Sequence, residues 1–117
     1  MSETTLIYHN PRCSKSRASL AILQQHEVEL EVMEYLKTPP SKATLKQLLK
    51  LLDCSVRDII RTGQNEYREL QLDNTDLSDE ALLDAMIENP ILIERPIVVR
   101  GDKAVIGRPP ENVLALL

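Results

Sequence analysis

The chain has 117 residues, a formal net charge of −4, and an apolar content of 43%, with no Phe, no Trp and three Tyr. This length fits one domain whose core is built from aliphatic side chains. The negative charge argues against a nucleic-acid surface held by bulk electrostatics, and the apolar runs are far too short to cross a membrane. We therefore expect a protein that binds neither nucleic acid nor membrane.

The first predicted elements are a strand, a loop and a helix. The apolar run Leu6-Ile7-Tyr8 is typical of a short strand, and apolar residues at helical spacing follow the loop: Ala18, Ala21 and Ile22. Pro11 suits the loop or the helix start, because its φ is fixed and it lacks an N–H. Polar and apolar residues alternate from Glu31 to Tyr35, which predicts a second strand. Together these elements predict a βαβ unit with parallel strands.

Four helical pieces are predicted between the Thr38-Pro39-Pro40 break and Asn89-Pro90. Ser41 and Ser78 can each cap a helix with a regular apolar stripe. Between them, Ser55 resembles the cap of a short helix reaching residue 61, and residues 66–70 form another short piece.

The last third predicts a hairpin and a closing helix. Residues 97–99 and 104–106 are short strands joined by the turn Arg100-Gly101-Asp102-Lys103, and residues 111–117 form the helix. The order is β-α-β, helical pieces, then β-β-α, which is the thioredoxin arrangement once the middle helices are removed. We therefore predict an α/β fold: a single thioredoxin-like domain over residues 1–117 with a mixed sheet and a helical insertion at about 41–89.

Cys13 is the candidate nucleophile, because it lies at or next to the first residue of the first predicted helix. The free N–H groups and the dipole of a helix N-terminus favour a thiolate, and such positions lower a cysteine pKa from about 8.5 to roughly 3.5–7.5. Ser16 can turn its hydroxyl toward the sulfur, and positive charge is supplied nearby by Arg12, Lys15, Arg17 and His9. The alternative is a small buried hydrophobe, but the polar neighbours favour a reactive thiol.

Four motifs carry a resemblance that covers nearly the whole chain. They are Tyr8-His9-Asn10-Pro11-x-Cys13-x-x-Ser16-Arg17, Ser55-Val56-Arg57-x-Ile59-Ile60-Arg61, Asn89-Pro90-Ile91-Leu92-Ile93-x-Arg95-Pro96-Ile97-Val98-Val99 and Arg108-Pro109. In this order they closely resemble the glutaredoxin-linked arsenate reductase family, ArsC. The resemblance implies a thioredoxin-like fold with a helical insertion. It also implies reduction of arsenate to arsenite with glutathione as co-substrate and glutaredoxin as partner. We expect no bound metal or cofactor.

The resemblance also assigns roles by position. Cys13 matches the family's nucleophile, His9 and Ser16 match residues that tune the thiolate, and three arginines match an oxyanion cradle: Arg61, Arg95 and Arg108. A guanidinium meets two oxygens of a small tetrahedral anion at once, so three of them can replace its hydration. The alternative for each arginine is a solvated surface charge.

Pro96 is a candidate cis proline, because it directly precedes the third predicted strand, where thioredoxin-like folds commonly place one facing the reactive cysteine. An ordinary trans proline at a strand start is the alternative. Cys54 has no counterpart in the family motifs, so it is either a half-buried small residue or a resolving thiol for Cys13.

Some features leave the function open. The basic residues Arg12 and Lys15, and the end of the chain at Leu117, resemble a shorter chromosomal branch of the family. One alternative is a glutathione-dependent thiol reductase acting on another substrate. Another is an Spx-like regulator that binds RNA polymerase, but those resemble a Cys-x-x-Cys switch and the second position here is Ser16. Two cysteines and no visible secretion signal predict a reducing cytoplasm, and we expect a monomer.

Overall fold

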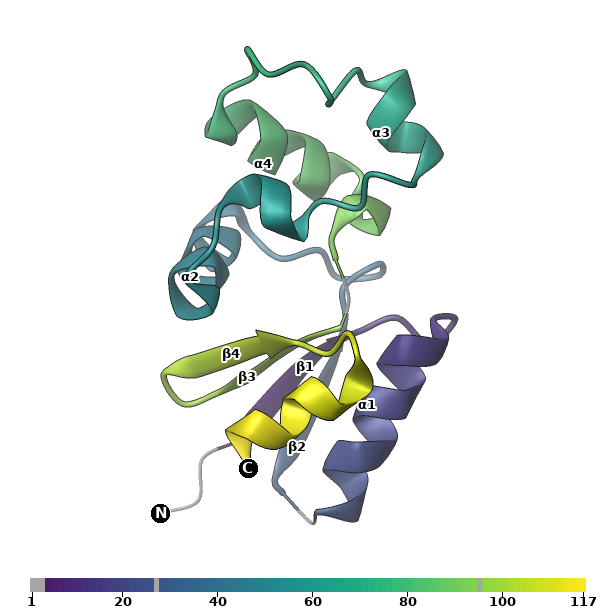
Figure 1. Ribbon diagram of the computed structural model, residues 1–117, viewed down its shortest axis with the longest axis vertical. Coiled ribbons are helices and arrows are strands. Elements are labelled where there is room, and N and C mark those ends of the chain that lie inside the picture. The colour runs from purple at the N-terminus through teal and green to yellow at the C-terminus, as the bar shows by residue number, and fades with distance from the viewer. Residues whose placement is uncertain (1–3, 27, 95) are drawn as a thin grey trace. The chain divides into compact units, whose positions relative to one another are not determined.

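The computed structural model describes residues 4–26, 28–94 and 96–117, which group into two compact units. One unit holds the β-sheet and contains residues 4–38 and 96–117, and the other is helical and contains residues 39–94. Figure 1 labels the elements of both units. Across the described ranges, every helix is too short or too polar to serve as a membrane span.

A four-stranded mixed sheet forms the first unit. Its strands lie in the order β2-β1-β3-β4 and are β1 (Thr5–His9), β2 (Leu30–Glu34), β3 (Ile97–Arg100) and β4 (Lys103–Ile106). β1 pairs parallel with β2 and antiparallel with β3, and β3 pairs antiparallel with β4. The β3–β4 turn contains Gly101 at a φ of 61°, a conformation that suits glycine. The predicted α/β fold with a mixed sheet and a C-terminal hairpin is therefore confirmed.

Two helical segments cover one face of this sheet. They are α1 (Ser14–Gln25), which connects β1 to β2, and the 3-10 helix η3 (Pro110–Leu116), the last segment in Figure 1. Ile7 and Val98 are partners across β1 and β3, and they form a fully buried cluster with Leu23 of α1 and Val113 of η3. Each such side chain contributes about 1.5–3 kcal/mol on burial. This cluster fixes α1 on the sheet and thereby fixes the loop before it.

Two details differ from the sequence predictions. Ala21, predicted on the apolar side of the first helix, is exposed, and the buried positions of α1 are Ser16, Ser19 and Leu23. The serines can be buried because their hydroxyls bond to other segments, which an apolar periodicity does not reveal. The closing segment is a 3-10 helix rather than the predicted α-helix, and it begins at Pro110, whose fixed φ suits a helix start.

The second unit consists of α2 (Lys42–Leu52), η1 (Val56–Ile59), α3 (Asn65–Glu69), α4 (Asp79–Glu88) and η2 (Pro90–Leu92). The predicted caps are confirmed. The hydroxyl of Ser41 accepts from the Thr44 N–H at 3.1 Å, and that of Ser78 accepts from the Ala81 N–H at 3.2 Å. The buried residues of α2 and α4 are Leu45, Leu48, Leu82, Leu83 and Met86.

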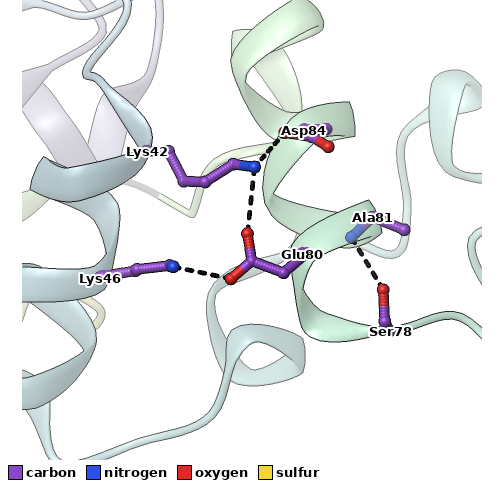
Figure 2. Close-up of polar contacts among 6 residues, drawn as sticks. All are labelled: Lys42, Lys46, Ser78, Glu80, Ala81 and Asp84. Atoms are coloured by element: carbon purple, nitrogen blue, oxygen red, sulfur yellow. Dashed lines mark hydrogen bonds and ion pairs between the residues drawn. The ribbon is translucent and has the colours of Figure 1, made fainter.

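Ion pairs join α2 to α4 on the outside of this unit (Figure 2). Lys42 Nζ lies 2.7 Å from Asp84 Oδ1 and 3.0 Å from Glu80 Oε2, and Lys46 Nζ lies 2.7 Å from Glu80 Oε1. Hydrogen bonds to Asp84 and Glu80 raise the pKa of Lys42, and hydrogen bonds from Lys46 and Lys42 lower the pKa of Glu80. Because these side chains are exposed, each pair contributes little to stability. We infer that these ion pairs help to align α2 with α4.

Candidate active site

The β1–α1 loop places Cys13 at the N-terminus of α1. Cys13 is the N-cap residue, with φ −95° and ψ 124°, and is 9% exposed. Its N–H donates to the Asn10 carbonyl at 3.0 Å, and the Arg12 N–H donates to Asn10 Oδ1 at 3.0 Å. Its side chain is buried, as the alternative of a small buried residue predicts, while its neighbours Arg12 and Ser14 are exposed. The predicted position at a helix start is confirmed.

Ser16 joins the first turn of α1 to β1. Its Oγ lies 2.6 Å from His9 Nδ1 and accepts from the Asn10 N–H at 3.0 Å. Because the oxygen already accepts one hydrogen bond, the hydroxyl proton can donate to Nδ1 of a neutral His9. All three residues are buried, with Ser16 fully inaccessible. Ser16 therefore orients His9 and the loop backbone, and its predicted effect on the Cys13 sulfur stays a prediction.

The environment of His9 favours a neutral imidazole. Burial lowers the pKa of His9 below its ordinary value, Glu34 opposes this effect and Arg17 adds to it. Arg17 also donates from Nη1 to the Pro11 carbonyl at 3.1 Å, which holds its guanidinium over the loop. The sequence predicts that His9 is one of the positive groups near Cys13. The structure instead favours a buried neutral ring, hydrogen-bonded to Ser16, because desolvation disfavours the charged form.

Arg108 belongs to the same unit as Cys13 and follows Gly107 at the end of β4. Ser19 of α1 donates to the Gly107 carbonyl at 3.3 Å, and the Gly107 N–H donates to the Pro96 carbonyl at 2.9 Å. A Cβ on Gly107 would lie 2.8 Å from Pro96 Cγ and would also clash with Ser19, so the close approach needs glycine. The helix that begins beside Cys13 therefore contacts the segments before β3 and after β4 at Gly107. The next residue, Arg108, is exposed.

Asn112 holds the backbone around Arg108. Its side-chain Nδ2 donates to the Ile106 carbonyl at 3.1 Å and to the Arg108 carbonyl at 3.2 Å. Asn112 is not among the site residues that the sequence predicts. The sequence offers one indication of this role. Asn112 follows Pro109-Pro110 within one turn, and Asn side chains commonly form hydrogen bonds with nearby backbone.

Arg61 lies in the second unit. The predicted short helix is η1, which ends before Ile60 because Ile60 forms an antiparallel β-bridge with Ile93. The Arg61 N–H donates to the Leu92 carbonyl at 2.7 Å. The Arg61 side chain is half-buried, and the Gln64 carboxamide oxygen can accept from its guanidinium, 3.3 Å from Nη2. The backbone of Arg61 is thus tied to the segment that leads toward β3.

Arg95 lies outside the described residues. Its predicted role in the oxyanion cradle and the predicted cis bond between Arg95 and Pro96 therefore stay predictions. Pro96 itself is buried. Within the described residues, the cis peptide bond is Arg108–Pro109.

Cys54 lies between α2 and η1 and is half-buried. Burial raises the pKa of its thiol, and the nearby carboxylates of Asp58 and Asp53 raise it further. A protonated thiol is a poor nucleophile, so this environment disfavours a resolving role. Among residues 4–26, 28–94 and 96–117, the His, Cys, Asp and Glu side chains form no group of three or more that could hold a metal ion.

The chain is similar to proteins of one family over nearly its whole length. A model of the ArsC family matches residues 8–116. An arsenate reductase of Neisseria meningitidis serogroup B is 47% identical over 112 residues, which is 95% of this chain and 96% of the relative. The uncharacterized protein YfgD of Escherichia coli K12 is 52% identical over 118 residues, 100% of this chain and 99% of that protein. The solved structure of an arsenate reductase from Vibrio cholerae has 47% identity and a TM-score of 0.96, with 100% of both chains covered.

Proposed function

Because this chain belongs to the ArsC family, we propose that it reduces arsenate to arsenite with Cys13 as the nucleophile. The observation that carries the proposal is the position of Cys13 as N-cap of α1, beside the buried hydrogen bond between His9 and Ser16. The helix N-terminus favours the thiolate and also attracts an oxyanion. The same feature therefore activates the nucleophile and recruits its substrate. Relatives named arsenate reductase, at 47% identity over 95% of the chain, support this reaction.

The first proposed step is attack of the Cys13 thiolate on arsenic. A sulfur–arsenic bond forms and one arsenate oxygen leaves as water after protonation, so arsenic stays in the +5 state. Glutathione thiolate then attacks the Cys13 sulfur. A disulfide forms, the sulfur–arsenic bond breaks, and its electron pair leaves with arsenic, which becomes +3. The net change converts the protein thiol, glutathione and arsenate into a mixed disulfide, arsenite and water. Glutaredoxin thiol then takes the glutathionyl group and returns Cys13 to its reduced form.

The arginines supply the proposed oxyanion cradle. Arg108 is exposed next to Gly107, which is bonded to the helix that carries Cys13. Arg61 and Arg95 are proposed from the family motifs, with Arg61 contributed by residues 39–94. We propose accordingly that residues 1–117 act as one thioredoxin-like domain with a helical insertion at about 41–89. We further propose that it works as a monomer in a reducing cytoplasm, where Cys13 and Cys54 stay as thiols.

The test is arsenate-dependent turnover with glutathione and glutaredoxin. We expect the wild type to turn over, Cys13→Ser to fall to background while keeping its circular dichroism spectrum, and Cys54→Ala to stay within twofold of wild type. Unaltered turnover in Cys13→Ser would refute the nucleophile. A wild type without arsenate-dependent turnover would favour a glutathione-dependent thiol reductase that acts on another substrate.

The cradle has its own test, which is protection of Cys13 from alkylation by arsenate or sulfate across pH. Arg108→Ala should weaken the protecting anion by about 1.5–3 kcal/mol, which is roughly a tenfold to 150-fold rise in its dissociation constant. Arg68→Ala removes the same charge from an exposed site on α3 and serves as the control. Equal protection of wild type and Arg108→Ala would remove Arg108 from the cradle.

A further inference from the structure

A groove adjoins the loop that carries Cys13. It has a volume of about 290 Å³ and is lined by residues of the β1–α1 loop and of the turn after β2: Asn10, Pro11, Arg12, Glu34, Leu36 and Lys37. The two walls lie together because β1 and β2 are parallel, with His9 opposite Glu34, so both strands end at the same edge of the sheet. Arg12 directly precedes Cys13 in the chain, so one wall of the groove belongs to the loop that carries the proposed nucleophile, while Cys13 itself is not among the lining residues.

The charges of the groove have a distinct pattern. Arg12 and Lys37 supply two cations and Glu34 supplies one anion. Lys37 Nζ lies 3.5 Å from Glu34 Oε1, but the Lys37 side chain is 79% exposed, so it can turn to another partner. The backbone under them is fixed, because the N–H groups of Lys37 and Thr38 both donate to the Glu34 carbonyl at 3.0 Å. A ligand with two carboxylates and one ammonium matches this set.

The apolar part of the groove agrees with a peptide ligand. Leu36 is 38% exposed, and Pro11 on the opposite wall is also exposed. A cleft near 300 Å³ with an apolar surface and a few convergent polar groups is typical of a small-molecule site. An arsenate ion carries no apolar surface and no cationic group, so neither Leu36 nor Glu34 serves it. The groove therefore fits the thiol donor better than the oxyanion.

We propose that this groove binds glutathione, with Arg12 and Lys37 receiving its two carboxylates and Glu34 its ammonium. The inference rests on the proposed function, which requires a thiol donor beside Cys13. Arg12 and Lys37 are then residues that determine specificity for the donor. A neutral thiol such as 2-mercaptoethanol has no carboxylate and gains nothing from these residues.

Turnover with two donors tests this specificity. Arg12→Gln and Lys37→Gln should each raise the KM for glutathione about tenfold. For Lys37→Gln, the KM for arsenate and the rate with 2-mercaptoethanol should stay within twofold of wild type. Lys15→Gln is the control, because Lys15 is an exposed cation of the same segment that does not line the groove. An unchanged KM for glutathione in both variants, or an equal rise in Lys15→Gln, would overturn the proposal.

A binding experiment separates this inference from the reaction itself. Titration of S-methylglutathione, which has no free thiol, into ¹⁵N-labelled Cys13→Ser protein should shift the amide resonances of Arg12, Leu36 and Lys37, and Lys37→Gln should weaken the binding. This readout needs no arsenate. If the groove resonances shift but the wild type shows no arsenate turnover, the proposed function is refuted and the glutathione site is supported. Arsenate turnover with shifts confined to residues elsewhere would keep the function and refute the site.

Discussion

Ser16→Ala tests whether the buried hydroxyl beside Cys13 organises the site. The change removes the oxygen that lies 2.6 Å from His9 Nδ1 and accepts from the Asn10 N–H at 3.0 Å. Both groups are buried, and a buried polar group left without its partner costs about 1–3 kcal/mol. We therefore expect the free energy of unfolding to fall by roughly 2–5 kcal/mol, because two buried polar groups lose their partner at once.

The measurement is urea unfolding followed by far-ultraviolet circular dichroism, with the midpoint and slope fitted for each variant. Ser14→Ala is the matched control, because Ser14 is exposed in the same turn of α1, and we expect its effect to stay within about 0.5 kcal/mol. A Ser16→Ala protein as stable as Ser14→Ala would refute the reasoning. It would mean that His9 and Asn10 find other partners, and that Ser16 does not hold the loop.

Three further predictions concern single groups. Because burial lowers the pKa of His9, the unfolded chain binds the proton more readily. The His9 contribution to stability should therefore be intact above about pH 6.5 and decline as the pH falls below that value. The measurement is the urea midpoint of wild type and of His9→Gln at pH 8 and at pH 5. Midpoints that change in parallel in the two proteins would contradict this prediction. Cys54, whose pKa is raised by burial and Asp58, should react with iodoacetamide at pH 7 more slowly than a free cysteine, and a faster reaction would contradict the assigned environment. Gly107→Ala should lower the free energy of unfolding by about 1–3 kcal/mol, because the new Cβ would lie 2.8 Å from Pro96 Cγ; an unchanged thermal midpoint would count against that close approach.

Local chemistry determined much of the fold. The caps at Ser41 and Ser78 and the hairpin turn at Gly101 follow from side-chain hydrogen bonding and from φ preferences that act within a few residues. The placement of Cys13 at a helix start follows in the same way from an apolar run, a proline and a helical pattern. Such features need no distant contact, so the sequence alone contains them.

The tertiary structure decided which polar groups became buried. The sequence contains no sign that Ser19 would reach Gly107, or that Asn112 would hold the backbone of Arg108, because these bonds join segments whose proximity is set by packing on the sheet. For the same reason His9 is a buried ring that favours the neutral form: its protonation depends on desolvation by the folded chain. The groove between Arg12 and Lys37 also exists only because two parallel strands end side by side. The sequence therefore specified the candidate nucleophile and the local elements, while long-range packing specified the environment around that residue.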